Sequence, residues 1–220
     1  MGAFAVDYRR YDKRTFLNFG NIFFVLLVVG LVTLSFVIRA NRYFEIKQIS
    51  PAPERLRLAW KPEELEEASD LVVTGQIAAP GRTYRGETVR YMETRLIVDE
   101  VLSGDAAAGD VIIMTEECYT DNFGMTLWTQ EGYLPAEVGD CYLFFLKKYD
   151  DDSRYASMCY PVDLEYGKYR IPEDTETFSA DLQNAVTAED RDFFQLGPDG
   201  DLDEYARWYA YVMSRFLGLE

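Results

Sequence analysis

The sequence contains no histidine among its 220 residues. Histidine is the commonest general base, the usual activator of serine and cysteine nucleophiles, and a frequent zinc ligand. Its absence excludes Ser-His and Cys-His catalytic sites and any metal site built on imidazole. We therefore predict that the protein is not an enzyme, that it binds no cofactor and that it holds no metal.

Cysteine is scarce as well. The three cysteines are Cys118, Cys141 and Cys159, and no two of them form a Cys-x-x-Cys motif. A thiolate metal site would need a carboxylate as its fourth ligand, which favours a disulfide or free thiols over a metal. If the strands that carry Cys141 and Cys159 form a hairpin centred near Asp150, these two residues lie opposite one another and could form a disulfide. Cys118 could instead pair with either of them.

Basic residues are outnumbered, 22 against 38 acidic residues, and the net charge is -16. The imbalance is uneven along the chain. Residues 1–47 carry seven basic and three acidic residues, which leaves 15 basic and 35 acidic residues for the remainder. Because so negative a field repels phosphate backbones and anionic lipid headgroups, we expect no nucleic-acid partner.

One long apolar run stands near the N-terminus. Residues 22–38 read IFFVLLVVGLVTLSFVI without a charge, and with the residues before them they are long enough to cross a bilayer. The run lacks the polar stripe of a core helix, and no convincing signal-peptide cleavage site follows it. We predict a transmembrane signal-anchor helix over residues 17–39, which makes this a single-pass protein of the cell membrane.

The basic residues around this run do not decide its orientation, because four precede it and three follow it. The short N-terminal segment, the acidic domain and the cysteines favour an N-in orientation. Residues 1–16 then form a short basic cytoplasmic tail, and the C-terminal domain is extracytoplasmic. Residues 40–62 contain three prolines and are expected to form an extended stalk.

Residues 63–171 are expected to form a β-barrel. Within them, residues 138–148 read VGDCYLFFLKK, in which a continuous apolar run follows a Gly-Asp turn. Such a run is typical of a strand that is covered on both faces. The other four strands are predicted at 71–77, 89–102, 111–115, and 155–162 with 169–171. The alternation of the second strand breaks phase after Val98, which indicates a β-bulge.

The order EASDLVVTGQI, TRLIVDEVLSGD, GDVIIM, PAEVGDCYLFFLKK and YPVDLEYGKYRI resembles the netrin-like, TIMP-like OB-fold domains of uncharacterised bacterial envelope proteins. The resemblance covers about residues 66–171. It implies a five-stranded barrel and an envelope location, and it transfers no catalytic residues. The expected fold is therefore mostly β: a five-stranded OB-type Greek-key barrel with C-terminal helices, preceded by a single N-terminal transmembrane helix.

Two segments depart from the family pattern, an insertion at residues 117–137 and a C-terminal helical extension at residues 172–220. Long loops inside compact domains are usually functional, and aromatic side chains are enriched at binding surfaces. We identify a candidate binding surface in the aromatic residues of the insertion, Tyr119, Phe123, Trp128 and Tyr133. The alternative is that these side chains pack over an open end of the barrel.

In the extension, apolar residues recur at helical spacing from Leu202 to Phe216, after an aspartate that can cap the helix. This stripe is expected to pack on the barrel. Trp208 and Tyr211 lie off the stripe and are expected to face outward.

Together the anchor, the aromatic insertion and the missing catalytic set indicate a membrane-anchored extracytoplasmic binding or interaction module. Its partner would be a protein, a peptide or a glycan. The alternative is a structural single-pass subunit of an envelope complex. A glycan hydrolase built on two carboxylates comes third, because abundant acidic residues on a surface do not by themselves form a catalytic pair.

Overall fold

The computed structural model describes residues 21–33, 45–49, 59, 61–85, 90–121, 126–130, 133–150, 155–172 and 201–219. The chain divides into two compact units, Met1–Phe44 and Glu45–Glu220. Each unit is described by itself.

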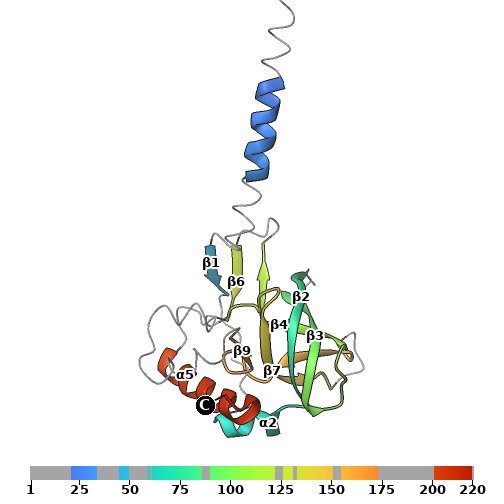
Figure 1. Cartoon of the computed structure of the whole chain (residues 1–220), viewed down its shortest axis with the longest axis vertical. Helices are drawn as coiled ribbons and strands as arrows, with labels where there is room; N and C mark the ends of the chain where they lie inside the picture. Colours follow the sequence, from blue (N-terminus) through green and yellow to red (C-terminus); the bar gives the residue numbers. More distant parts are fainter. Residues whose placement is uncertain are drawn as a thin grey trace, which may run out of the picture. The chain divides into compact units, whose positions relative to one another are not determined.

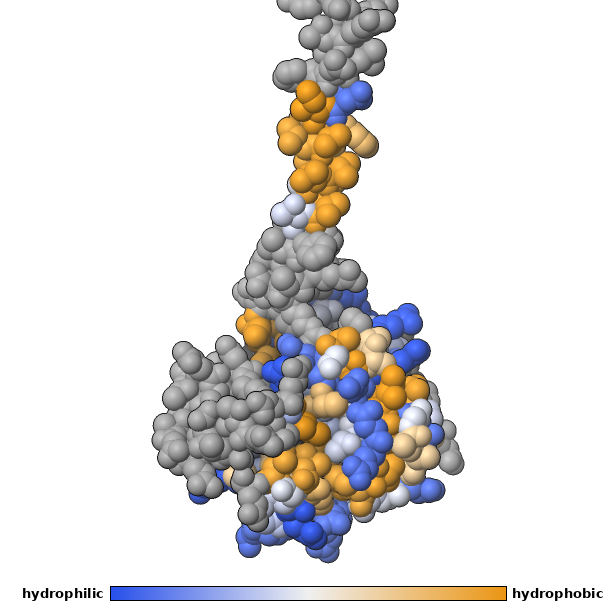
Figure 2. All heavy atoms as spheres, in the orientation of Figure 1, coloured by the Kyte–Doolittle hydropathy of each residue, from blue (hydrophilic) through white to orange (hydrophobic). Residues whose placement is uncertain are grey.

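In the first unit, residues 21–33 form a helix whose residues are all exposed. Hydrophobic side chains cover most of the helix face visible in Figure 2. The predicted tail at 1–16 and the two ends of the predicted anchor at 17–39 lie outside the described residues. Across the described parts of the chain, we found no helix whose length and hydropathy together suffice for a bilayer span.

The second unit is mostly β, as predicted. A short helical segment, η1 (Pro62–Glu64) and α2 (Leu65–Ala68), leads into the first long strand. The main sheet contains β2 (Leu71–Arg85), β3 (Arg90–Gly104), β4 (Val111–Glu116), β7 (Cys141–Lys148), β8 (Met158–Pro161) and β9 (Lys168–Arg170). Its order is β2-β3-β4-β8-β7-β9, and an additional pairing of β2 with β7 closes a ring of five strands. Within this ring only β4 and β8 run parallel.

A second, smaller sheet has the order β1-β6-β5. It contains β1 (Glu45–Gln48), β5 (Cys118–Thr120) and β6 (Thr126–Thr129). The last two strands come from the predicted insertion, which therefore forms a hairpin instead of an irregular loop. Four residues of the predicted stalk form β1, which lies beside β6 (Figure 1). These four residues are extended, as the predicted stalk would be, and they pair with β6 inside the second unit.

The two long strands β2 and β3 pair with several register shifts. One shift lies between Thr74 and Gly75, which pair with Glu100 and Val98, so that Asp99 is the extra residue. This is the bulge that the phase break after Val98 predicted. At Gly75 a Cβ atom would lie 2.3 Å from the carbonyl oxygen of Ile97, so only glycine permits this close approach of the two strands.

Strand β7 is the centre of the domain, because apolar side chains cover both of its faces. Its residues from Tyr142 to Leu146 are fully buried. Tyr142, Phe144 and Leu146 pack inside the strand ring with residues of β2, β3 and β4. Leu143 and Phe145 point to the opposite side, where they pack with the C-terminal helix. The prediction of a strand without an exposed face is confirmed.

The C-terminal helix α5 (Leu202–Val212) continues into a π-helical turn, η2 (Met213–Leu217). Its cap is Asp201, whose Oδ1 accepts a hydrogen bond from the backbone N–H of Glu204 at 2.9 Å. The hydroxyls of Tyr205 and Tyr209 donate to the carbonyl oxygens of Lys168 and Arg170 in β9, at 2.9 and 2.7 Å. These bonds fix the helix to β9 of the main sheet, next to the η1–α2 segment (Figure 1).

The outward position expected for Trp208 is wrong. Its side chain is only 4% exposed, and its ring stacks on Tyr166 with 4.2 Å between the ring centroids. The buried arc of α5 is therefore wider than the apolar stripe, because an aromatic surface of the barrel faces the neighbouring side of the helix as well. Tyr211 is half-buried.

Replacing Trp208 by Ala is expected to lower the free energy of unfolding by about 3–5 kcal/mol, because a large buried side chain is removed and a cavity remains. Urea denaturation of the full-length protein in detergent measures the change. Arg207→Ala is the matched control, since Arg207 is exposed on the same turn, and its effect should stay within about 0.5 kcal/mol. Equal effects of the two substitutions would contradict docking of α5 through Trp208.

Candidate binding surfaces

Three of the four aromatic residues predicted to form one binding surface are described, and these three do not share one surface. Tyr119 and Trp128 are half-buried on the outer face of the small sheet, where β5 and β6 place them opposite one another. Tyr133 is only 4% exposed. Phe123 lies outside the described residues. Two of the four thus belong to a surface, and one belongs to the interior.

Tyr119 and Trp128 form the middle of a row that we call the cation–aromatic strip, made of Lys47, Trp128, Tyr119 and Arg90. The two aromatic rings are nearly parallel, with 6.2 Å between their centroids. The Lys47 ammonium lies 5.6 Å from the centroid of Trp128, and the Arg90 guanidinium lies 5.4 Å from that of Tyr119. Both separations are in the range of a cation–π interaction. The strip therefore presents a flat aromatic centre with a positive charge at each end.

Tyr133 belongs to a buried polar cluster around the carboxyl group of Glu116, at the end of β4. Glu116 is fully buried. Its Oε1 accepts hydrogen bonds from the Tyr133 hydroxyl at 2.7 Å and from the Ala136 backbone N–H at 2.9 Å. Its Oε2 accepts one from the hydroxyl of Thr94 in β3. The cluster thus ties the segment after β6 to the barrel wall, which is a structural role.

Lys168 and Cys118 complete this cluster. The Lys168 ammonium donates to the carbonyl oxygen of Leu134 and lies 4.3 Å from the ring centroid of Tyr133. Cys118 is fully buried, and desolvation together with the nearby Glu116 raises the pKa of its thiol. A thiol held neutral in this way is a poor nucleophile. No group of three or more acidic or cysteine side chains among the described residues is arranged to hold a metal ion.

A second surface, which the sequence did not reveal, is a continuous row of five tyrosines that we call the tyrosine track. Its members, in spatial order, are Tyr84, Tyr91, Tyr155, Tyr149 and Tyr160. Successive ring centroids are separated by 5.0, 5.8, 5.1 and 4.7 Å. All except Tyr91 are half-exposed. The track therefore offers a long aromatic surface with several hydroxyl groups.

The tyrosine track joins two parts of the main sheet that are far apart in the sequence. Tyr84 and Tyr91 come from the ends of β2 and β3, Tyr149 and Tyr155 lie between β7 and β8, and Tyr160 lies in β8. The high tyrosine content, 16 of 220 residues, was the only signal in the sequence. The periodicity of the sequence could not reveal the tyrosine track, because its side chains meet only after distant strands have paired.

Hydrogen-bonding groups accompany the tyrosine track. The hydroxyls of Tyr149 and Thr115 are 2.7 Å apart. The carboxyl of Glu117 acts electrostatically on Tyr149, and burial raises the pKa of Glu117. Asp150 acts in the same way on Tyr160 and is itself exposed. Aromatic faces with carboxyl and hydroxyl groups beside them can bind a ligand that has both apolar faces and hydroxyls.

The register of β7 and β8 corrects the predicted cysteine arrangement. Cys159 lies opposite Lys148, whereas Cys141 lies opposite Gln76 at the other end of β7. Seven residues of strand separate Lys148 from Cys141, about 23 Å, and a disulfide needs Cα atoms within about 7 Å. All three cysteines are free in this structure. Cys141 is half-buried beside the Asp99 carboxyl group, and burial raises the pKa of its thiol.

Comparison of the chain with protein-family models, curated proteins and solved structures gave no match. The resemblance to netrin-like domains therefore remains a prediction. The arguments about function that follow are taken from the geometry described above.

Without reduction, the full-length protein is expected to react with a maleimide at Cys141 faster than at Cys118 or Cys159. Burial raises the pKa of all three thiols, but Cys141 is only half-buried, whereas Cys118 and Cys159 are buried and become reactive only on unfolding. Mass spectrometry of labelled peptides with and without urea measures the order. Labelling of Cys141 and Cys159 that rises after reduction alone would contradict the register reported above.

Tyr133→Phe is expected to lower the free energy of unfolding by about 1–3 kcal/mol, because the buried Glu116 carboxyl loses one of its hydrogen-bond donors. Urea denaturation measures the loss. The control is Tyr119→Phe, which removes the same atom from a half-buried ring of the cation–aromatic strip and should change stability by less than about 0.5 kcal/mol. A neutral Tyr133→Phe variant would show that the cluster does not anchor this segment.

Proposed function

We propose that the protein is a membrane-anchored extracytoplasmic binding module whose ligand is an oligosaccharide. The observation that carries this proposal is the tyrosine track. Its rings supply apolar faces on which sugar rings can stack, and tyrosine hydroxyls both donate and accept hydrogen bonds. Glu117 and Asp150 add carboxyl oxygens that can accept hydrogen bonds from sugar hydroxyls.

The strand order supports an OB-type barrel as the finer description of the fold. In OB-folds, the connection between the first and second strands and the connection between the fourth and fifth strands bind oligonucleotides and oligosaccharides. In this chain the corresponding connections are β2–β3 and β7–β8. Tyr84 and Tyr91 lie at the strand ends next to the first of these connections, and Tyr149 and Tyr155 lie in the second. This position of the tyrosine track supports the proposal of a ligand site there.

The charge of the chain favours an oligosaccharide over an oligonucleotide. Residues 48–220 carry 35 acidic and 15 basic residues, and such a field repels a phosphate backbone. A neutral or cationic sugar polymer experiences no such repulsion. A protein or peptide partner is the competing ligand, and the experiment below separates it from a glycan.

The membrane part of the proposal is supported by the apolar run at residues 22–38, whose described portion is helical and exposed. The anchor at 17–39, the N-in orientation and the extracytoplasmic location are parts of the proposal. The alternative of a structural subunit gains no support from α5, because the apolar side of this helix is buried against its own barrel.

The full-length protein in nanodiscs is expected to bind at least one neutral oligosaccharide on a glycan array, with the affinity then measured by calorimetry. Tyr155→Ala should lower that affinity at least tenfold, about 1.4 kcal/mol, because aromatic side chains at the centre of a binding surface contribute most of the binding energy. The matched control is Tyr211→Ala, which removes a half-buried tyrosine from α5 outside the track.

The melting temperatures of both variants show whether folding is preserved. Binding of peptides but of no glycan, or equal affinity of the two variants, would overturn the proposal. Release of reducing ends during the titration would instead indicate a hydrolase built on carboxylates.

A further inference from the structure

We propose that the cation–aromatic strip is a second binding surface, which lies on the headgroup layer of an anionic bilayer and holds the domain flat against the membrane. This inference rests on the membrane anchor of the proposed function and is independent of the oligosaccharide. It assigns the strip to lipid and leaves the tyrosine track for the soluble ligand.

The strip lies on the outer face of the small sheet. Trp128 pairs with Lys47 of β1 on one side and with Tyr119 of β5 on the other, so the three side chains form a row across the strands. The neighbours Leu127, Thr129 and Cys118 alternate with them and are fully buried. The sheet thus has one face toward the domain interior and one that bears the strip.

The number of residues between the predicted anchor and β1 limits how far the cation–aromatic strip can lie from the membrane. Strand β1 begins at Glu45, six residues after Arg39, where the predicted anchor ends. Six residues span at most about 22 Å even when fully extended. Lys47 follows Arg39 by eight residues, so its Cα atom can lie at most about 29 Å from the end of the predicted anchor, and a headgroup layer around that anchor is within its reach.

The composition of the strip matches that layer. Tryptophan and tyrosine are enriched at the membrane–water interface, where their rings lie among the headgroups. Lysine and arginine near the membrane surface are attracted to anionic lipids, and two such charges flank the two rings here. The four members of the row include two cations and no carboxylate, so an anionic surface attracts the row, whereas it repels the acidic remainder of the domain.

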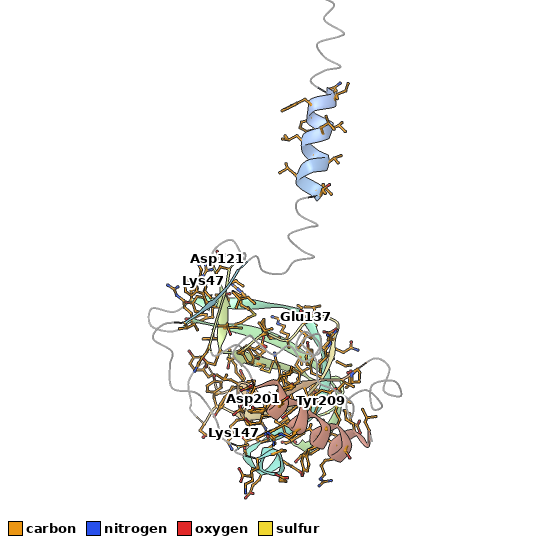
Figure 3. The ribbon with its side chains drawn as sticks, turned by 90° about the vertical axis from the view of Figure 1, so that its left-hand side faces the viewer. Lys47, Asp121, Glu137, Lys147, Asp201 and Tyr209 are labelled. Atoms are coloured by element: carbon orange, nitrogen blue, oxygen red, sulfur yellow. The ribbon has the colours of Figure 1, made fainter. Side chains whose placement is uncertain are left out.

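Acidic residues nearby restrict the strip to a small contact area. Asp121 lies at the same end of the domain as Lys47, whereas Lys147 lies toward the other end (Figure 3). The wider surface is thus not uniformly cationic. Docking depends on the two rings as much as on charge, and the anchor supplies the high local concentration that so small a contact needs.

The test uses the full-length protein in nanodiscs that contain phosphatidylcholine, phosphatidylglycerol and a lipid brominated near the top of its acyl chains. Bromine quenches tryptophan fluorescence only at short range. The signal of Trp128 is obtained by subtracting that of a Trp128→Phe variant, which removes the contributions of Trp60 and Trp208. We expect strong quenching of Trp128 in the anionic nanodiscs.

Replacing Lys47 and Arg90 together by Gln should shift the docking equilibrium more than about tenfold toward the free domain, because each cation contributes about fivefold near an anionic surface. Quenching then falls. The matched control replaces Arg95 and Arg207 by Gln, which makes the same change in net charge at exposed positions outside the strip. Its quenching should equal that of the unchanged protein.

Absence of Trp128 quenching, or an equal loss in both double variants, would overturn the inference. Extraction of vesicles with alkaline carbonate separates this outcome from failure of the anchor. A protein that resists extraction without Trp128 quenching has the anchor but not the docking surface. A protein that is extracted lacks the anchor, and the docking inference then fails together with the membrane part of the proposed function, whereas oligosaccharide binding is judged by its own titration.

Discussion

The structure depends on the need to cover both faces of β7. Each of its residues from Tyr142 to Leu146 is buried, and their side chains alternate between two separate clusters. One cluster fills the ring formed by β2, β3, β4, β8 and β7. The other can be completed only by an element outside the ring, and α5 supplies it. Loss of the packing on either face of β7 would expose large aromatic side chains to water, and each exposed side chain would cost about 2–3 kcal/mol of stability.

Aromatic residues serve two purposes in the domain: some stabilise the fold, and others form an accessible surface. In helix α5, which covers one face of β7, the hydroxyls of Tyr205 and Tyr209 donate to backbone carbonyls of β9. These side chains therefore orient the helix as well as bury apolar area. On the surface, tyrosine rings contact one another in a row and remain partly accessible to solvent. The first arrangement stabilises the fold, and the second leaves ring faces available to a ligand.

Negative charge divides the possible ligands between the two surfaces. The tyrosine track lies beside Glu117 and Asp150, which favours a ligand without phosphate groups. The cation–aromatic strip instead places Lys47 and Arg90 beside the rings of Trp128 and Tyr119. Membrane docking through the strip and sugar binding through the track would use different residues, so neither function needs to interfere with the other.

The sequence by itself determined the properties that depend on neighbouring residues. The apolar run of β7, the bulge after Val98, and the cap and stripe of α5 each follow from local spacing, and each is present in the structure. The tertiary structure alone decided which side chains meet across long distances in the chain. Tyr133 turned inward because the Glu116 carboxyl lies beneath it, and Trp208 because Tyr166 faces it. Cys159 lies opposite Lys148 because the pairing of β7 and β8 begins at that end of the strand. The physical reason is that periodicity fixes the face on which a side chain lies, whereas the pairing of distant strands into the five-strand ring fixes what that face meets.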